Sequence, residues 1–164
     1  MNRDEFIPKS EAKEQVRKMA SMMASLYYHF CCSIIDTLGK EKGEELIKKA
    51  IDAYGCEKGT KHRLFFEANG LPISPVTYTL QSDLPQLGWD VMIPEERINP
   101  THIIIKNCPL AEYWKEKNFT EVGQLYCRVD QAKYKAFHPD SNFKHLKNTL
   151  NNEPYCEMVC LDEK

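Results

Sequence analysis

The first part of the chain has the apolar periodicity of a long helix. Apolar residues recur every three or four positions from 10 to about 38, which predicts one amphipathic helix with Ser10 as its N-cap and Gly39 as its C-terminal stop. The methionines and the paired cysteines of this segment are expected to serve packing: Met19, Met22, Met23, Cys31 and Cys32.

A second helix is predicted over residues 42 to 54, where Gly55 can take the positive φ that ends many helices. Residues 57–70 are expected to add a partly helical segment. The period then changes to two, because Val76, Tyr78 and Leu80 alternate with polar residues, as in a half-buried strand.

The remaining pattern predicts a mixed fold. Residues 89–93 and 98–106 predict two more strands, and the run 103–105 favours a central place in the sheet. Helices are expected over 109–117, where Pro109 suits the first turn, and over 120–137. Strands at 142–150 and 154–161 would form a hairpin around asparagines that can adopt a left-handed turn. We therefore expect an α+β fold, a single domain over residues 1–164, with long N-terminal helices packed on an antiparallel sheet of about five strands and two helices inserted before the C-terminal hairpin.

Length and charge narrow the class of protein. The 164 residues match one ordinary domain, and 22 basic against 24 acidic residues leave no basic stripe for a nucleic-acid backbone. No apolar run approaches the roughly 20 residues that span a bilayer, and the N-terminus lacks a secretory signal, so we expect a cytoplasmic protein without a membrane partner. The seven cysteines are then expected to be reduced.

Candidate chemistry is concentrated in the last third of the chain. Cys127, Asp130 and Tyr134 are spaced i, i+3, i+7 in the predicted 120–137 helix, so a thiol, a carboxylate and a phenol share one face. That spacing lets the carboxylate orient or deprotonate a nucleophilic thiol. The plainer alternative is a small core cysteine beside a solvated aspartate.

Three further groups accompany this set. Cys108 precedes the helix at Pro109, whose positive end would lower the pKa of the thiol, although a buried junction residue is the alternative. Cys156 is expected to share a strand face with other apolar residues, as a core residue or as part of a site. His138 can act as a general acid or base or cap its helix. The other histidines are expected at the surface or in the core: His29, His62, His102 and His145.

A metal site is the alternative to thiol chemistry. Its ligands would be Cys108, Cys127, Asp130 and Cys156, although the absence of a Cys-x-x-Cys pair argues against structural zinc. The expected cofactor is thus either none or an unknown divalent metal.

Four segments resemble the signature of the L-2-amino-thiazoline-4-carboxylic acid hydrolase family: CPLAEYWK at 108–115, YCRVDQA at 126–132, FHP at 137–139 and NTLNNEPYCE at 148–157. The resemblance extends over about residues 45–161 and implies hydrolytic opening of a 2-aminothiazoline ring to N-carbamoyl-cysteine.

A thiol mechanism suits that reaction. Cys127 would be the nucleophile, Asp130 would orient or deprotonate, and His138 would protonate the leaving sulfur. Tyr134 would contact the substrate, and Cys108 with Cys156 would line the pocket or replace Cys127 as the nucleophile. In the metal version a cation would activate water.

A non-catalytic alternative is a small-molecule or metal-sensing domain similar to 4-vinyl-reductase-type domains. In either case the expected partner is a small molecule, and self-association into a homo-oligomer is left open.

Overall fold

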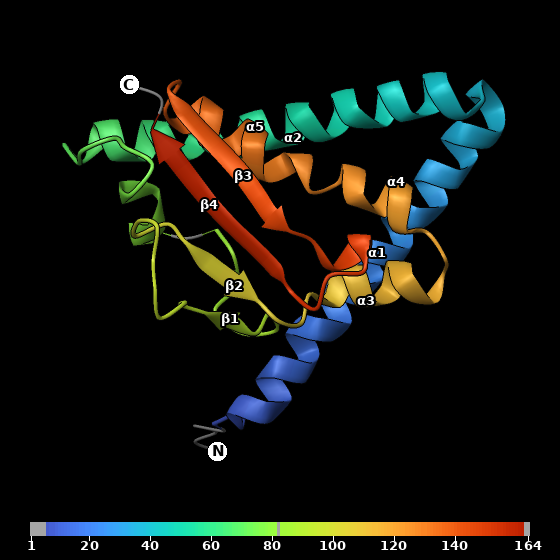
Figure 1. The fold of residues 1–164 in the computed structure, drawn as a ribbon, viewed down its shortest axis with the longest axis horizontal. Coiled ribbons are helices and arrows are strands. Elements are labelled where there is room, and N and C mark those ends of the chain that lie inside the picture. The colour runs from blue at the N-terminus through green and yellow to red at the C-terminus, as the bar shows by residue number, and fades with distance from the viewer. Residues whose placement is uncertain (1–5, 82, 163–164) are drawn as a thin grey trace, which may run out of the picture.

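Two long helices frame the molecule. The computed structural model describes residues 6–81 and 83–162, in which α1 (Lys9–Leu38) and α2 (Lys40–Ala68) meet at a sharp bend and diverge from it as an open V (Figure 1). The predicted stop at Gly39 is confirmed, since its φ of 79° lies where glycine is favoured. The prediction that Ser10 caps α1 is wrong. The helix begins at Lys9 after Pro8, whose restricted φ suits a helix start.

The predicted end of the second helix at Gly55 is also wrong, because α2 continues to Ala68. Gly55 and Gly59 instead face α5 (Arg128–Phe137). A Cβ at Gly55 would lie 2.6 Å from the Cβ of Ala132 and 2.7 Å from the Val129 carbonyl oxygen, and one at Gly59 would meet the backbone of α5. These two glycines, one turn apart, therefore let the two helix backbones approach closely.

The predicted helices of the second half are present in modified form. Pro109 opens α3 (Pro109–Glu116), as expected. The predicted 120–137 helix is two helices, α4 (Thr120–Leu125) and α5. Between them the backbone stays right-handed, but its amides bond three residues back: Cys127 N–H donates to Gln124 and Val129 N–H donates to Tyr126. This tighter winding changes the direction in which Cys127 points relative to a continuous α-helix.

The sheet is antiparallel, as predicted, and in the described part of the chain it has four strands rather than about five. They are β1 (Val91–Met92), β2 (Ile103–Ile105), β3 (Ser141–Lys147) and β4 (Cys156–Asp162), in the order β1-β2-β4-β3. The predicted position of 103–105 inside the sheet is confirmed. So is the C-terminal hairpin, in which a 3₁₀ turn, η2 (Thr149–Asn151), leads to Asn152 with a left-handed φ of 65°.

The missing strand is the one predicted from residue 76. Residues Thr77–Gln81 form a 3₁₀ helix, η1. Ser74 N–H donates to Thr77 Oγ1 over 2.9 Å, and Thr77 N–H donates to Ser74 Oγ over 3.3 Å. Such local side-chain bonds compete with strand pairing, and the turn they hold carries Tyr78 into the core.

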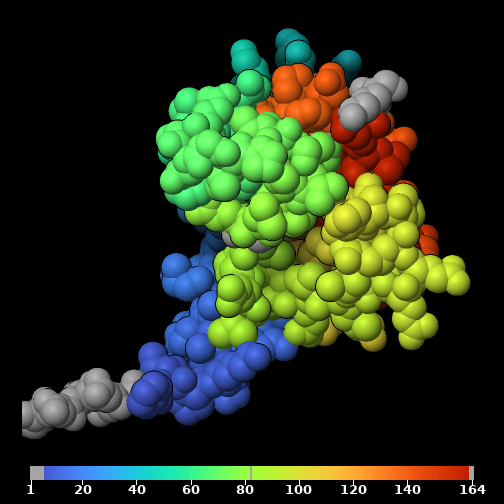
Figure 2. Space-filling view, turned by 90° about the vertical axis from the view of Figure 1, so that its left-hand side faces the viewer, coloured from blue at the N-terminus to red at the C-terminus, as the bar shows by residue number. Residues whose placement is uncertain are grey.

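Two apolar clusters fill the interior. The first lies among α1, α3 and α4 around Trp114, whose indole N–H donates to the Ala24 carbonyl over 3.0 Å. The second lies between the sheet and the α2–α5 pair, where Tyr134 stacks on both Tyr78 and Phe143. Trp89 and Cys108 pack against both clusters. The segment after α2, green to yellow in Figure 2, covers one side of this interior.

Among the helices of residues 6–81 and 83–162, none has both the length and the apolar character that crossing a bilayer requires.

We predict that Gly55→Ala lowers the free energy of unfolding by about 2 kcal/mol, because the added methyl group overpacks a backbone contact. Urea denaturation measures this change. The control is Lys49→Ala on the exposed side of α2, which should stay within about 0.5 kcal/mol of the parent protein. A stabilisation of about 1 kcal/mol, the usual result of replacing an exposed helical glycine, would contradict the close approach.

Candidate functional site

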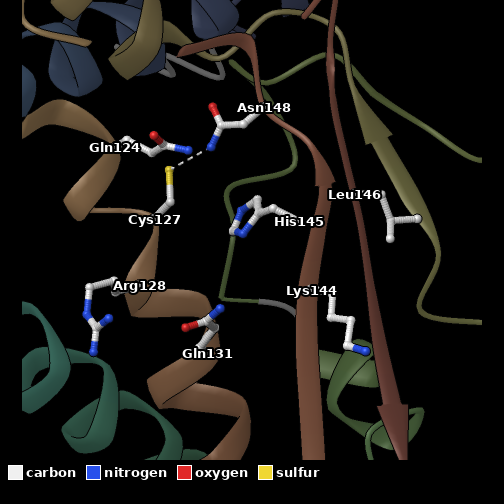
Figure 3. Close-up of a pocket in the computed structure, with 8 residues that line it drawn as sticks. All are labelled: Gln124, Cys127, Arg128, Gln131, Lys144, His145, Leu146 and Asn148. Atoms are coloured by element: carbon white, nitrogen blue, oxygen red, sulfur yellow. Dashed lines mark hydrogen bonds between the residues drawn. The ribbon is translucent and has the colours of Figure 1, made fainter. Parts of the chain in front are cut away.

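An open pocket of about 420 Å³ lies between the α4–α5 segment and β3 (Figure 3). The residues that line it are Gln124, Cys127, Arg128, Gln131, Lys144, His145, Leu146 and Asn148. Lys144 and Leu146 point away from Cys127, so the groups that face the pocket are a thiol, an imidazole and three carboxamides. This set can bind and react with a small polar molecule.

Cys127 lies at the tight junction between α4 and α5. The side-chain amide of Asn148 donates to its sulfur over 3.5 Å. Burial raises the pKa of the Cys127 thiol, and this effect outweighs the Asn148 hydrogen bond, which acts in the opposite direction. Cys127 is therefore a protonated thiol near neutral pH and needs a base to become a nucleophile.

Asp130 lies one turn further on and belongs to a charged network. Its carboxylate is 2.8 Å from the Lys133 ammonium, which also pairs with Asp83 at 3.0 Å. Lys58 approaches the other oxygen of Asp83 at 3.2 Å. Burial disfavours the charged form of Lys133, but the two carboxylates outweigh it and raise its pKa. Asp130 is thereby held in place beside the pocket.

His145 is the group that sequence reasoning assigned to surface or core. Its Nε2 lies 3.6 Å from Asp130 Oδ2, and burial lowers its pKa, more than Asp130 raises it. The imidazole is therefore neutral at neutral pH. Figure 3 shows the ring of His145 and the sulfur of Cys127 turned toward the same space. The sequence contained one indication of this position, the alternation of side chains along a strand. Phe143 and His145 lie on the same face of β3, so a strand that buries Phe143 against α5 also presents His145 to that helix.

Asn148 was the second residue missed as a site candidate. Its amide donates to Cys127, while its Oδ1 lies 3.9 Å from the thiol of Cys156. Asn148 thus stands between the two cysteines, and Cys156 lies behind it, in the core, with a hydrogen bond from the Thr149 amide at 3.4 Å.

The structure does not bring the other predicted site residues into the pocket. Tyr134 is buried in the aromatic stack between Tyr78 and Phe143, where it lines no part of the pocket. His138 ends α5, eleven residues or about 16 Å of helix from Cys127, and its N–H donates to the Tyr134 carbonyl.

Cys108 precedes α3, as predicted, but the expected lowering of its pKa is wrong. Hydrogen bonds from the Leu110 and Ala111 amides favour the thiolate, yet burial outweighs them and raises the pKa. Cys108 and Cys156 are close enough to Cys127 to disfavour its ionised form.

The proposed metal ligands were tested against the geometry. Within residues 6–81 and 83–162, no three His, Cys, Asp or Glu side chains are arranged to hold a metal ion. Cys108, Cys127, Asp130 and Cys156 therefore do not form a ligand set in this conformation.

Arg128 closes one edge of the pocket. Its guanidinium donates to both oxygens of Asp52 on α2, at 3.0 and 2.7 Å. This bidentate pair holds the start of α5 against α2 and leaves the carboxamides of Gln124 and Gln131 as neutral hydrogen-bonding groups in the pocket.

One comparison with known proteins identifies the family of this chain. A family model described as L-2-amino-thiazoline-4-carboxylic acid hydrolase matches residues 17–159, most of the chain. The protein belongs to this family, as the resemblance in the sequence indicated. A search of curated proteins and one of solved structures gave no match.

We predict that iodoacetamide modifies Cys127 much more slowly than the exposed Cys56 at about pH 8, because burial keeps the Cys127 thiol protonated. Peptide mass spectrometry after timed quenching gives both rates. The Cys127 rate should still be rising at a pH where an ordinary thiol is fully ionised. Faster modification of Cys127 than of Cys56 would contradict the raised pKa.

Proposed function

We propose that this chain hydrolyses a small sulfur- and nitrogen-containing heterocycle, such as L-2-amino-thiazoline-4-carboxylate, to N-carbamoyl-cysteine in the pocket between α5 and β3. The observation that carries the proposal is that Cys127 opens into this pocket beside the imidazole of His145, which Asp130 supports. Nucleophile, base and orienting carboxylate are the three parts of a thiol hydrolase.

In the first step one bond forms and one bond breaks. The sulfur of Cys127 attacks C2 of the ring, the carbon between the ring sulfur and the two nitrogens. The bond between C2 and the ring sulfur breaks, and the electron pair leaves with that sulfur. The product is an isothiourea joined to Cys127, with the cysteine part of the substrate still attached through nitrogen.

His145 handles the proton in this step. The raised pKa of Cys127 means that its proton must be removed during the attack, and the lowered pKa of His145 keeps its imidazole neutral and able to accept it. The protonated ring then donates that proton to the leaving sulfur, while the nearby carboxylate of Asp130 stabilises the imidazolium. His145 thus takes the role that the sequence suggested for His138.

The second step releases the enzyme. Water adds to the isothiourea carbon as His145 accepts one of its protons, and the other water proton ends on the substrate nitrogen. The bond between that carbon and the Cys127 sulfur then breaks, its electron pair leaves with the sulfur, and the imidazolium of His145 returns its proton to regenerate the thiol. The Asn148 amide, which already donates to the sulfur, stabilises the departing thiolate. The carboxamides of Gln124 and Gln131 can orient the N–H groups of the amidine.

The metal and sensor alternatives predict different measurements. Loss of turnover on exhaustive chelation, with recovery on adding one divalent metal, would favour a metal-activated water over the thiol. Stoichiometric ligand binding without turnover would favour a sensor. The proposal expects turnover that chelation leaves unchanged.

Replacing Cys127 by alanine should reduce kcat for ring opening by at least about a thousand-fold, because the step that forms the covalent intermediate is lost. Product formation is followed by the appearance of the free thiol of N-carbamoyl-cysteine. The matched control is Cys56→Ala on the exposed surface of α2, which should keep full activity. Full turnover by Cys127→Ala would exclude this mechanism.

Replacing each histidine by glutamine distinguishes the role of His145 from that of His138. We expect His145→Gln to lower kcat by about 10²- to 10⁴-fold through loss of the base, and His138→Gln to change it less than severalfold. In the parent enzyme, kcat/KM should fall with acidity below the lowered pKa of His145, where the base becomes protonated. The reverse ranking of the two variants would restore the role first assigned to His138.

A further inference from the structure

One face of α1 carries large apolar side chains that the fold leaves uncovered. Its members are Met19, Met22, Met23, Leu26 and Phe30, each 41–65% exposed. The sequence suggested that these methionines pack inside, and that prediction is wrong. A different face of the helix, with the buried Ala20, Ala24 and Cys31, is the one that packs in the core. Figure 2 shows the first part of α1 standing out from the body of the molecule.

The uncovered residues form a continuous seam. Their spacing of three and four positions places them in one row along the helix, as in a coiled coil. Side chains of this size, about half exposed, contribute on the order of 100 Å² each, so the Met19–Phe30 face has roughly 500 Å² of apolar surface. That equals the largest patches that monomers usually carry. Two such faces together bury about 1,000 Å², the lower limit for a specific interface.

We propose that the Met19–Phe30 face binds the same face of a second copy of this chain, with the two α1 helices antiparallel. The seam contains no charged residue between Met19 and Phe30, so two copies can meet without burying like charges. A twofold interface requires a self-complementary surface of this kind.

The charges beside the seam select the antiparallel direction. Lys18 and Asp36 are both exposed and are eighteen residues apart, which is five full turns, so they lie on the same flank of α1. In an antiparallel pair with its axis at residue 27, Lys18 of each copy faces Asp36 of the other. In a parallel pair the twofold axis runs along the helices, so the two copies of this flank lie on opposite sides of the interface and Lys18 does not meet Asp36.

The same axis gives a packing of side chains. Phe30 of one copy lies level with residue 24 of the other, between Met22, Met23 and Leu26 of that copy. Methionines adapt to an aromatic ring and make favourable sulfur contacts with it. Each copy therefore provides an inserting side chain, Phe30, and the gap among Met22, Met23 and Leu26 that receives Phe30 of the other copy.

Sedimentation velocity from roughly 1 to 100 µM tests the proposal, a range that covers interfaces of this size. The parent protein should sediment as a dimer, and Leu26→Lys should sediment as a monomer with unchanged circular dichroism. Leu80→Lys, at a 71% exposed position on η1, is the matched control and should remain a dimer. A monomeric parent protein, or a dimeric Leu26→Lys, would overturn the proposal.

Charge exchange tests the direction of pairing. In Lys18→Glu each of the two Lys18–Asp36 pairs becomes a pair of acidic side chains, so the dimer Kd should rise about tenfold. The double variant Lys18→Glu with Asp36→Lys restores opposite charges in both pairs and should return the Kd to the parent value. Failure of the double variant to restore the parent Kd overturns the antiparallel arrangement. A parent protein that stays monomeric but sediments with vesicles of phosphatidylcholine and phosphatidylserine would assign the face to a lipid surface instead.

Discussion

The contact between α2 and α5 through Gly55 and Gly59 is the constraint on which the rest of the site depends. Without Cβ atoms at these positions, the backbone of α5 lies directly against α2. The sheet packs in turn on α5, where Phe143 of β3 stacks on Tyr134. Both walls of the pocket are therefore positioned from α2 outward, one through backbone contact and one through an aromatic stack.

The charges beside the pocket explain why a neutral imidazole suits it. Lys58 and Lys133 balance Asp83 and Asp130, so this half-buried network carries no net charge with His145 unprotonated. A proton on His145 would give this group of side chains a net positive charge. Burial disfavours that charge most and Lys133 adds to the effect, while Asp130 favours it, so the pKa of His145 is lowered overall. An imidazole in such surroundings accepts a proton during a reaction and returns it readily.

The sequence predicted the α+β class and the antiparallel hairpin, because these follow from local periodicity. It also singled out Cys127 and Asp130, whose separation of three residues keeps them close together even though the predicted helix is divided just before Arg128. For His145 the sequence contains only part of the signal, since strand alternation places it on the same face as Phe143. Its partnership with Asp130 depends on how β3 lies on α5, which no local pattern contains.

Glycine and methionine illustrate the same limit. A glycine that ends a helix and one that admits a neighbouring helix look alike in sequence, so Gly55 was taken for the former. An apolar seam on α1 likewise does not reveal whether it faces the core. The side chains of Ser74 and Thr77 hydrogen-bond to each other's backbone, so the alternating segment after α2 forms η1 instead of a strand. The alternation of apolar and polar residues does not reveal these bonds.

Trp89 and Cys108 touch both apolar clusters, and this double contact has a consequence for how the protein opens. Two cores that shared no residue would be free to melt separately, as independent folding units. Here the loss of one removes part of the packing of the other at the same two side chains. The helices and the sheet are thus expected to unfold in one cooperative transition, and the pocket between α4–α5 and β3 persists only while that transition has not begun.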